Sequence, residues 1–221
     1  MRNVEEDPRS SQYEEVNLQG RNIRDLRYAD DTALLSRTVE GLGHLVEAVK
    51  EHSEAKDLML NVKKTKVMDT DKCQVKTNLE VDGQMLENVI HFEYLGARVE
   101  NDGRSKNEIA RRIAIASQKL GNLKKIWESQ SNKLKLDLLR ACIFLVVLYG
   151  CEAWAPLRTD LDRIRSFEMK CYRKILKVVW TDKISNQEVR NRVIQSSYLI
   201  SLYMKLKFSY FGHIKRQRRQ S

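Results

Sequence analysis

The pattern of apolar residues changes abruptly at Asn101-Asp102-Gly103, and this change limits the chain to a fold built in two parts. Before Gly103, short apolar segments are separated by turn residues, which is typical of β-hairpins. After Gly103, apolar residues recur every three or four positions over long stretches, which indicates amphipathic helices. The sequence therefore predicts an α+β fold with a loose segment at residues 1–15, a hairpin-rich domain at 16–103 and an all-helical domain at 104–221.

The charge of the chain changes at the same place. Residues 1–103 contain 14 Lys/Arg and 21 Asp/Glu, whereas residues 104–221 contain 26 Lys/Arg and 9 Asp/Glu. Such asymmetry predicts that the C-terminal half binds a polyanion, most commonly nucleic acid. The alternative interpretation is that these cations only solvate exposed helix faces.

Four segments of the N-terminal half have a clear secondary-structure signal. The segment from Val16 to Ser36 predicts a hairpin, and the segment from Thr38 to Lys56 predicts a helix with an apolar face. The segment from Leu58 to Met68 predicts a basic strand or the end of a strand. The segment from Leu79 to Arg98 predicts two strands around Asp82-Gly83, which is a hairpin signal.

Five helices are expected in the C-terminal half. A capping box, Ser105 to Glu108, begins the first, and further helices are predicted at about 132–149, 159–179, after Ser185, and 198–214. Aromatic side chains on these helices are expected in the core rather than on base-stacking surfaces. These aromatic residues are Trp127, Trp154, Trp180, Tyr203 and Phe211.

Adjacent carboxylates occupy the centre of the first predicted hairpin, in the sequence Tyr28-Ala29-Asp30-Asp31. A tight turn can aim two neighbouring side chains in one direction. Hard divalent cations such as Mg²⁺ prefer carboxylate oxygens, so this turn is a candidate metal site. An ordinary hairpin with a polar tip is the alternative interpretation.

The string from Leu26 to Leu35 resembles the catalytic turn of reverse transcriptases from non-LTR (LINE-type) retrotransposons. Five further segments resemble motifs of the same family, in the family's order. They are Leu60 to Lys66, His91 to Gly96, Glu108 to Ile113, Leu148 to Trp154 and Phe211 to Arg216. The resemblance covers the chain from about Val16 onward and implies the end of a polymerase palm followed by a thumb and a C-terminal extension.

The resemblance also implies roles for individual residues and for their ligands. Asp30 would be the principal ligand of Mg²⁺ or Mn²⁺ and Asp31 its neighbour, while Lys64 would assist the leaving pyrophosphate. Residues that would contact the nucleotide or the primer are Tyr28, Tyr94, Leu95 and Gly96. The implied partners are an RNA template, a DNA primer and deoxynucleoside triphosphates.

Two departures from the family pattern affect the expected activity. The family commonly has Gly where this chain has Asp57, which could disturb the turn that follows the helix. The fingers and the palm strand with the first catalytic aspartate would precede Met1. We therefore expect the isolated chain to be inactive as a polymerase, and to derive from a truncated element copy or a partial gene model.

The helical half resembles a polymerase thumb, which holds nucleic acid through its phosphates. The candidate phosphate contacts are Arg111, Arg112, Lys119, Lys124, Lys125, Arg173, Lys174 and Lys177. The alternative function is a non-catalytic nucleic-acid-binding module that acts through these basic helices. A relic without any present function is a third alternative.

Cysteine spacing and hydropathy bound the remaining classes of protein. The four cysteines are widely spaced without a C-x-x-C pair, so reduced and mostly buried thiols are expected. The longest apolar run, Ile143 to Tyr149, is far shorter than a bilayer span. We expect an intracellular protein, in the nucleus or the cytoplasm, that does not bind membranes.

Overall fold

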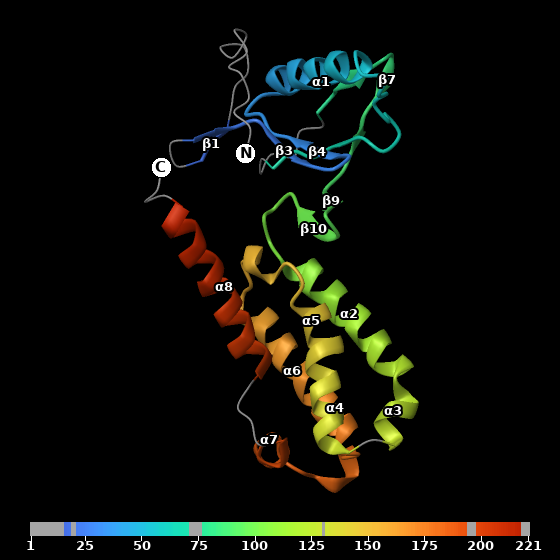
Figure 1. Ribbon diagram of the computed structural model, residues 1–221, viewed down its shortest axis with the longest axis vertical. Helices are drawn as coiled ribbons and strands as arrows, with labels where there is room; N and C mark the ends of the chain where they lie inside the picture. The colour runs from blue at the N-terminus through green and yellow to red at the C-terminus, as the bar shows by residue number, and fades with distance from the viewer. Residues whose placement is uncertain (1–15, 19–20, 71–76, 130, 194–197, 218–221) are drawn as a thin grey trace. The chain divides into compact units, whose positions relative to one another are not determined.

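The computed structural model describes residues 16–18, 21–70, 77–129, 131–193 and 198–217. The chain divides into two compact units, Met1–Tyr94 (unit 1) and Leu95–Ser221 (unit 2), which are drawn in Figure 1. The fold class is α+β, as predicted. The division falls before Gly103 because strand β10 (Ala97–Glu100) packs against helix α2 (Lys106–Asn122) of unit 2. The predicted loose segment 1–15 lies outside the described residues.

The described residues of unit 1 form three antiparallel hairpins and one parallel strand pair. The hairpins are β1 (Val16–Leu18) with β2 (Arg21–Ile23), β3 (Asp25–Tyr28) with β4 (Asp31–Leu34), and β6 (Glu80–Val81) with β7 (Gln84–Met85). The parallel pair is β5 (Lys66–Val67) with β8 (Glu87–Asn88), and strand β9 (His91–Tyr94) ends the unit. The Asp82-Gly83 hairpin is confirmed: both residues have positive φ, at +55° and +72°, as a two-residue hairpin turn favours.

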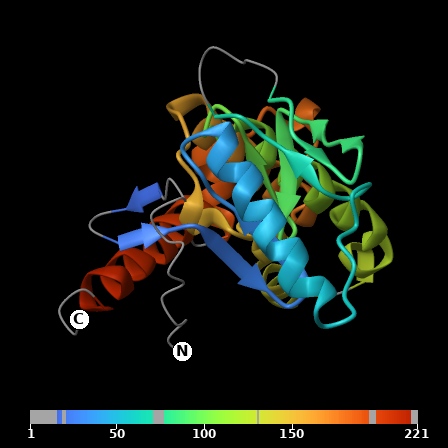
Figure 2. The ribbon, with the colours of Figure 1, turned by 90° about the horizontal axis from the view of Figure 1, so that it is seen from above.

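Helix α1 (Val39–Glu54) packs against β4, and the β1–β2 pair lies to one side of the helix (Figure 2). Thr38 caps it as its side chain accepts a hydrogen bond of 3.2 Å from the Gly41 amide. Val46 of α1 is buried with Val67 and other apolar residues from the strands and their connections, and Leu34 of β4 packs against this cluster. The packing of α1 and β4 on one core therefore fixes the base of the β3–β4 hairpin.

The strand predicted from Leu58 to Met68 is wrong for most of its length. Residues 62–64 form a turn, and only Lys66–Val67 is a strand. Asn61 causes the turn: its backbone oxygen accepts hydrogen bonds from the amides of Lys64 and Thr65, both at 3.0 Å, and from the Thr65 hydroxyl at 2.9 Å. The Asn and Thr of this motif thus close a loop instead of alternating across a sheet.

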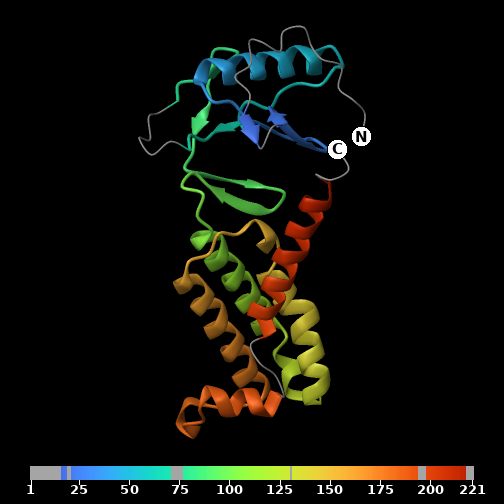
Figure 3. The same ribbon diagram turned by 90° about the vertical axis from the view of Figure 1, so that its left-hand side faces the viewer.

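Unit 2 is a bundle of helices, shown in Figure 3. α2 is followed by α3 (Lys124–Ser129), and α4 (Asn132–Leu138) continues through the π-helical η2 (Leu139–Phe144) into α5 (Leu145–Val147). The short η3 (Cys151–Ala153) precedes α6 (Arg158–Ile175), and η4 (Trp180–Asp182) precedes α7 (Asn186–Val193) and α8 (Tyr198–Gln217). The predicted helices are present, but the first is broken at Leu123 and the third ends at Ile175 instead of at residue 179.

The core of unit 2 lies between α2, the α4–η2–α5 helix, α6 and α8. Ile109, Ile143 and Ile164 are fully buried there, and the predicted core positions of Trp127, Trp154 and Tyr203 are confirmed at 3–4% exposure. Trp180 and Phe211 are corrections, since they are 88% and 64% exposed. Trp180 lies in the η4 turn between helices, and the part of α8 around Phe211 extends past the residues that cover Tyr203.

The predicted capping box at Ser105 is wrong. Ser105 does precede α2, but its hydroxyl accepts a hydrogen bond of 3.0 Å from the Ala155 amide instead of capping the helix. Glu108 pairs with Arg111 and Arg112. The cap at Ser185 is confirmed, because its hydroxyl accepts a hydrogen bond of 3.2 Å from the Glu188 amide. Among the helices that the structure describes, none is both long and apolar enough to cross a bilayer.

Candidate functional site

The β3–β4 hairpin carries the two adjacent aspartates at its tip. Tyr28 pairs with Asp31 in the last register position, which leaves Ala29 and Asp30 as the two turn residues. Ala29 adopts φ = +49°, a conformation that costs about 1–2 kcal/mol for an L-residue. A two-residue connection between twisted strands requires such a conformation, so the backbone of this turn is set by the pairing on either side of it.

Both carboxylates of this turn are exposed to solvent. The neighbouring Asp25 forms an ion pair with Arg27 at 3.1 Å, but within the described ranges Asp30 and Asp31 have no ion-pair partner. The described residues also contain no cluster of three or more His, Cys, Asp or Glu side chains that could hold a metal. The hairpin therefore offers two hard oxygen donors, and water or phosphate would complete the coordination of a Mg²⁺ ion.

Tyr94 connects two of the predicted site segments, although they are 68 residues apart. Its hydroxyl donates a hydrogen bond of 3.3 Å to the backbone oxygen of Leu26 in β3. The motif at the end of β9 therefore lies beside the hairpin that carries Asp30 and Asp31. Tyr28, at the end of β3, is 65% exposed next to the same carboxylates.

Lys64 lies in the turn made by Asn61, with an exposed side chain. In the described part of the chain, no hydrogen bond or ion pair joins Lys64 to the β3–β4 hairpin. The role of Lys64 at the leaving pyrophosphate therefore stays a prediction. Its ammonium group is exposed and thus accessible to a phosphate.

Leu95 and Gly96 form a tight turn with φ of +49° and +74°. Their backbone oxygens accept hydrogen bonds from other residues of unit 2: the Tyr149 hydroxyl donates to Leu95 at 2.8 Å, and Arg111 donates to Gly96 at 2.7 Å. Arg112 also donates to the Gly96 oxygen. The turn that is predicted to contact the primer thus also attaches the start of β10 to α2 and Tyr149.

Arg111 and Arg112 form a network around the buried Glu108. Glu108 is 2% exposed and accepts bonds from Arg111 Nε at 2.8 Å and Arg112 Nε at 2.6 Å. Burial by itself would raise the pKa of Glu108, but the two guanidinium groups outweigh it and hold this pKa below its usual value. Arg112 is 8% exposed and its guanidinium lies 4.3 Å from the centre of the Tyr149 ring. This arginine stabilises unit 2 and, being buried, is not available to a phosphate.

The remaining predicted phosphate contacts lie at the ends of helices. Lys119 is in the last turn of α2, and Lys124 and Lys125 begin α3; all three side chains are exposed. Lys174 and Lys177 are exposed at the end of α6, and Lys177 adopts φ = +55°.

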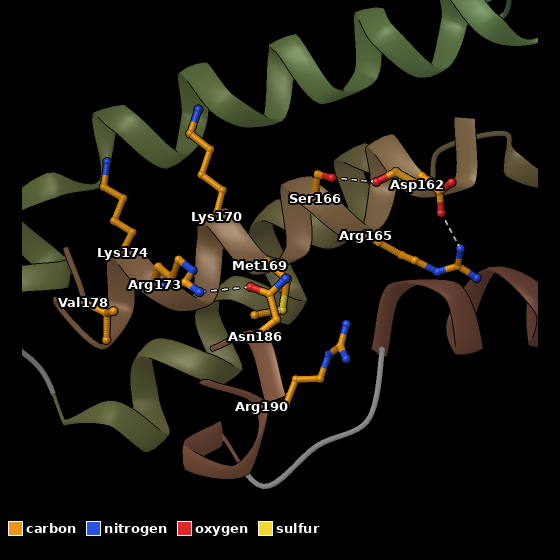
Figure 4. Close-up of a pocket in the computed structure, with 10 residues that line it drawn as sticks. All are labelled: Asp162, Arg165, Ser166, Met169, Lys170, Arg173, Lys174, Val178, Asn186 and Arg190. Carbon is orange, nitrogen blue, oxygen red and sulfur yellow. Dashed lines mark hydrogen bonds and ion pairs between the residues drawn. The ribbon is translucent and has the colours of Figure 1, made fainter. Parts of the chain in front are cut away.

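Part of the basic surface is a groove between α6 and α7, with a volume of about 660 Å³. Figure 4 shows its lining, which includes the predicted Arg173 and Lys174. Sequence reasoning missed the other cations of the groove, Arg165, Lys170 and Arg190. Arg165 and Lys170 could have been found from α6 alone, because helical spacing places them near Arg173 and Lys174. Arg190 comes from another helix and had no such signal.

The chain is similar to a putative uncharacterized transposon-derived protein of Caenorhabditis elegans, with 22% identity over 210 residues. The matched region covers 92% of this chain and 75% of that protein, so the similarity includes both units. No family model and no solved structure matches the chain.

Proposed function

We propose that the chain is a transposable-element protein derived from a reverse transcriptase, with a metal-binding palm remnant in unit 1 and a nucleic-acid-binding unit 2. The transposon-derived name of the Caenorhabditis elegans relative supports the origin. The observation that carries the enzymatic part is the two-residue turn with Asp30 and Asp31 at the tip of a hairpin that Tyr94 contacts.

Asp30 and Asp31 would hold the divalent ion in this proposal. When bound, such an ion stabilises charge on the transferred phosphate and aligns the attacking hydroxyl. Two carboxylates on one turn fit one hard cation, and a third carboxylate is absent from their surroundings among the described residues. We therefore expect the isolated chain to bind a divalent ion and nucleic acid but to incorporate no nucleotide.

Binding of Mn²⁺, measured by electron paramagnetic resonance of the free ion, tests the metal site. We expect the double variant Asp30→Ala/Asp31→Ala to weaken binding by about tenfold or more, equivalent to about 1.4 kcal/mol. Asp82→Ala is the matched control, because Asp82 also lies in a two-residue hairpin turn. Equal Mn²⁺ binding by wild type and the Asp30/Asp31 variant would refute the metal site.

The second candidate function is a non-catalytic nucleic-acid-binding module, which the basic groove of unit 2 favours. Primer–template binding and deoxynucleotide incorporation separate the two functions. If binding persists in the Asp30→Ala/Asp31→Ala variant while Mn²⁺ binds neither protein, the module is correct. Binding to the primer–template should weaken steeply with salt, since the lysines and arginines of the protein displace counterions from the phosphates.

A further inference from the structure

The groove between α6 and α7 carries a strong excess of positive charge. Five cations and one carboxylate line it, and the carboxylate, Asp162, is paired with Arg165 at 2.7 Å. Within the described ranges, Lys170, Lys174 and Arg190 form no ion pair. Lys170 and Lys174 are four residues apart on α6, where like charges destabilise a helix. A bound anion would attract both lysines and offset their mutual repulsion. The groove is therefore suited to a ligand with several negative charges.

Arg173 fixes the walls of the groove relative to one another. Its Nη2 donates hydrogen bonds to the Ile184 backbone oxygen at 2.8 Å and to Asn186 Oδ1 at 3.0 Å. These bonds join α6 to the start of α7, on the side from which Arg190 extends, while Lys170 and Lys174 lie along the other side of α6 (Figure 4). A phosphate that contacts Arg173 therefore meets a guanidinium that is already held in place, which lowers the ordering cost of that contact.

Trp180 lies close to this groove in the chain, two residues after its lining residue Val178. It is 88% exposed, whereas the other two tryptophans of the chain are buried. Two hydrogen bonds close the turn that presents it: the Val179 amide donates to Asp182 Oδ2 at 2.9 Å, and the Val178 amide donates to the Arg173 oxygen at 2.9 Å. The exposed indole of Trp180 therefore offers a face on which a base can stack.

We propose that the α6–α7 groove and Trp180 bind single-stranded nucleic acid, with phosphates in the groove and a base stacked on the indole. A nucleic-acid strand carries one phosphate per nucleotide, so several phosphates can contact the five cations of the groove. A base can stack on Trp180 only when it is not paired and stacked within a duplex, which favours a single strand. The inference rests on the nucleic-acid-binding part of the proposed function and is independent of the metal site at Asp30 and Asp31.

Tryptophan fluorescence of the full chain, titrated with a 15-residue oligodeoxythymidine, tests the proposal. We expect the oligonucleotide to quench the exposed Trp180, and Trp180→Leu to weaken binding by about 5- to 150-fold, the range for loss of one stacked base. Because Trp180→Leu removes that signal, the affinities of wild type and variants are compared with a fluorescein-labelled oligonucleotide. The substitution is at an exposed position, so the fold of unit 2 should be unaffected.

Two lysine variants measure the contribution of the groove. Lys170→Ala/Lys174→Ala should reduce the slope of log affinity against log salt by about 1.4, because each phosphate contact on a single strand contributes about 0.7. The control, Lys106→Ala/Lys133→Ala, removes the same charge at exposed positions of unit 2 outside the groove and should leave more of the slope intact.

Three outcomes would overturn the proposal. Polyglutamate that binds as tightly as the oligonucleotide would assign the groove to an acidic peptide. A duplex that binds as tightly, without dependence on Trp180, would assign it to double-stranded nucleic acid. Equal effects of the two lysine variants would show that net charge, and not the groove, determines binding. The Asp30→Ala/Asp31→Ala variant should bind the oligonucleotide as tightly as wild type, because the groove does not depend on the metal site.

Discussion

The buried ion-pair network at the start of α2 gives the sharpest stability prediction. Glu108 is 2% exposed and accepts hydrogen bonds from both Arg111 and Arg112, the second of which has a side chain only 10% exposed. The change Glu108→Gln removes the charge and leaves Arg112 buried beside a neutral amide. Breaking a buried pair in this way costs about 3–5 kcal/mol, and the low end, about 3 kcal/mol, applies because Arg111 is partly exposed and glutamine keeps one acceptor.

A matched pair on the surface provides the control. Glu188 and Arg192 have the same four-residue spacing as Glu108 and Arg112, at 3.2 Å, but each side chain is about half exposed. Glu188→Gln should therefore cost only about 0.3–0.5 kcal/mol. The comparison keeps the substitution and the helical spacing constant and varies the burial of the pair.

Urea unfolding followed by tryptophan fluorescence measures both variants. All three tryptophans lie in unit 2, so their emission reports on the unit that contains both pairs. The depressed pKa of Glu108 adds a dependence on pH. Its contribution is present above the unfolded-state value of about 4.3 and is lost as pH falls through the lower folded-state value. The difference between wild type and Glu108→Gln should therefore shrink in acid. A cost at pH 7 no larger than that of Glu188→Gln would refute the reasoning.

Two further predictions concern backbone strain and thiol reactivity. Asp57 has φ = +58° at the end of α1, so Asp57→Gly should stabilise the protein by about 0.5–1 kcal/mol; thermal unfolding monitored by circular dichroism measures this, and a lower stability than wild type contradicts it. Cys142 is exposed, whereas burial raises the pKa of the Cys171 thiol to about 12. At pH 8 iodoacetamide should modify Cys142 well before Cys171, as judged by peptide mass spectrometry; equal rates would show that α6 opens readily.

Local signals were sufficient for most secondary structure. The Asp82-Gly83 turn and the Thr38 cap depend on interactions within a few residues, and the structure has both. Asp57 stands where the family that the sequence resembles commonly has glycine, and its left-handed conformation gives a physical reason for a glycine at such a position. The chain forms this turn with an aspartate, which costs some stability. From the sequence pattern alone, a strained turn could not be distinguished from a lost one.

Predictions failed where a side chain has a distant partner. Ser105 matches a capping box, but the Ala155 amide, 50 residues away, takes its hydroxyl. Arg112 looks like any basic residue on a helix, yet it is buried against Tyr149 and Glu108. Trp180 failed for another reason: it was expected in the core as part of an apolar helical face, but helix α6 ends at Ile175 and Trp180 lies exposed in the η4 turn.

The sequence alone determined the α+β class, the position of the Asp30-Asp31 turn and the excess of cations after Gly103, because hairpin turns, helical periodicity and net charge are written in neighbouring residues. Only the tertiary structure decided which of those cations are available to a ligand. Arg112 neutralises a buried carboxylate, whereas Lys170, Lys174 and Arg190 line an open groove. The difference arises from burial and from contacts between helices far apart in the chain, and residue type and spacing do not encode either one locally.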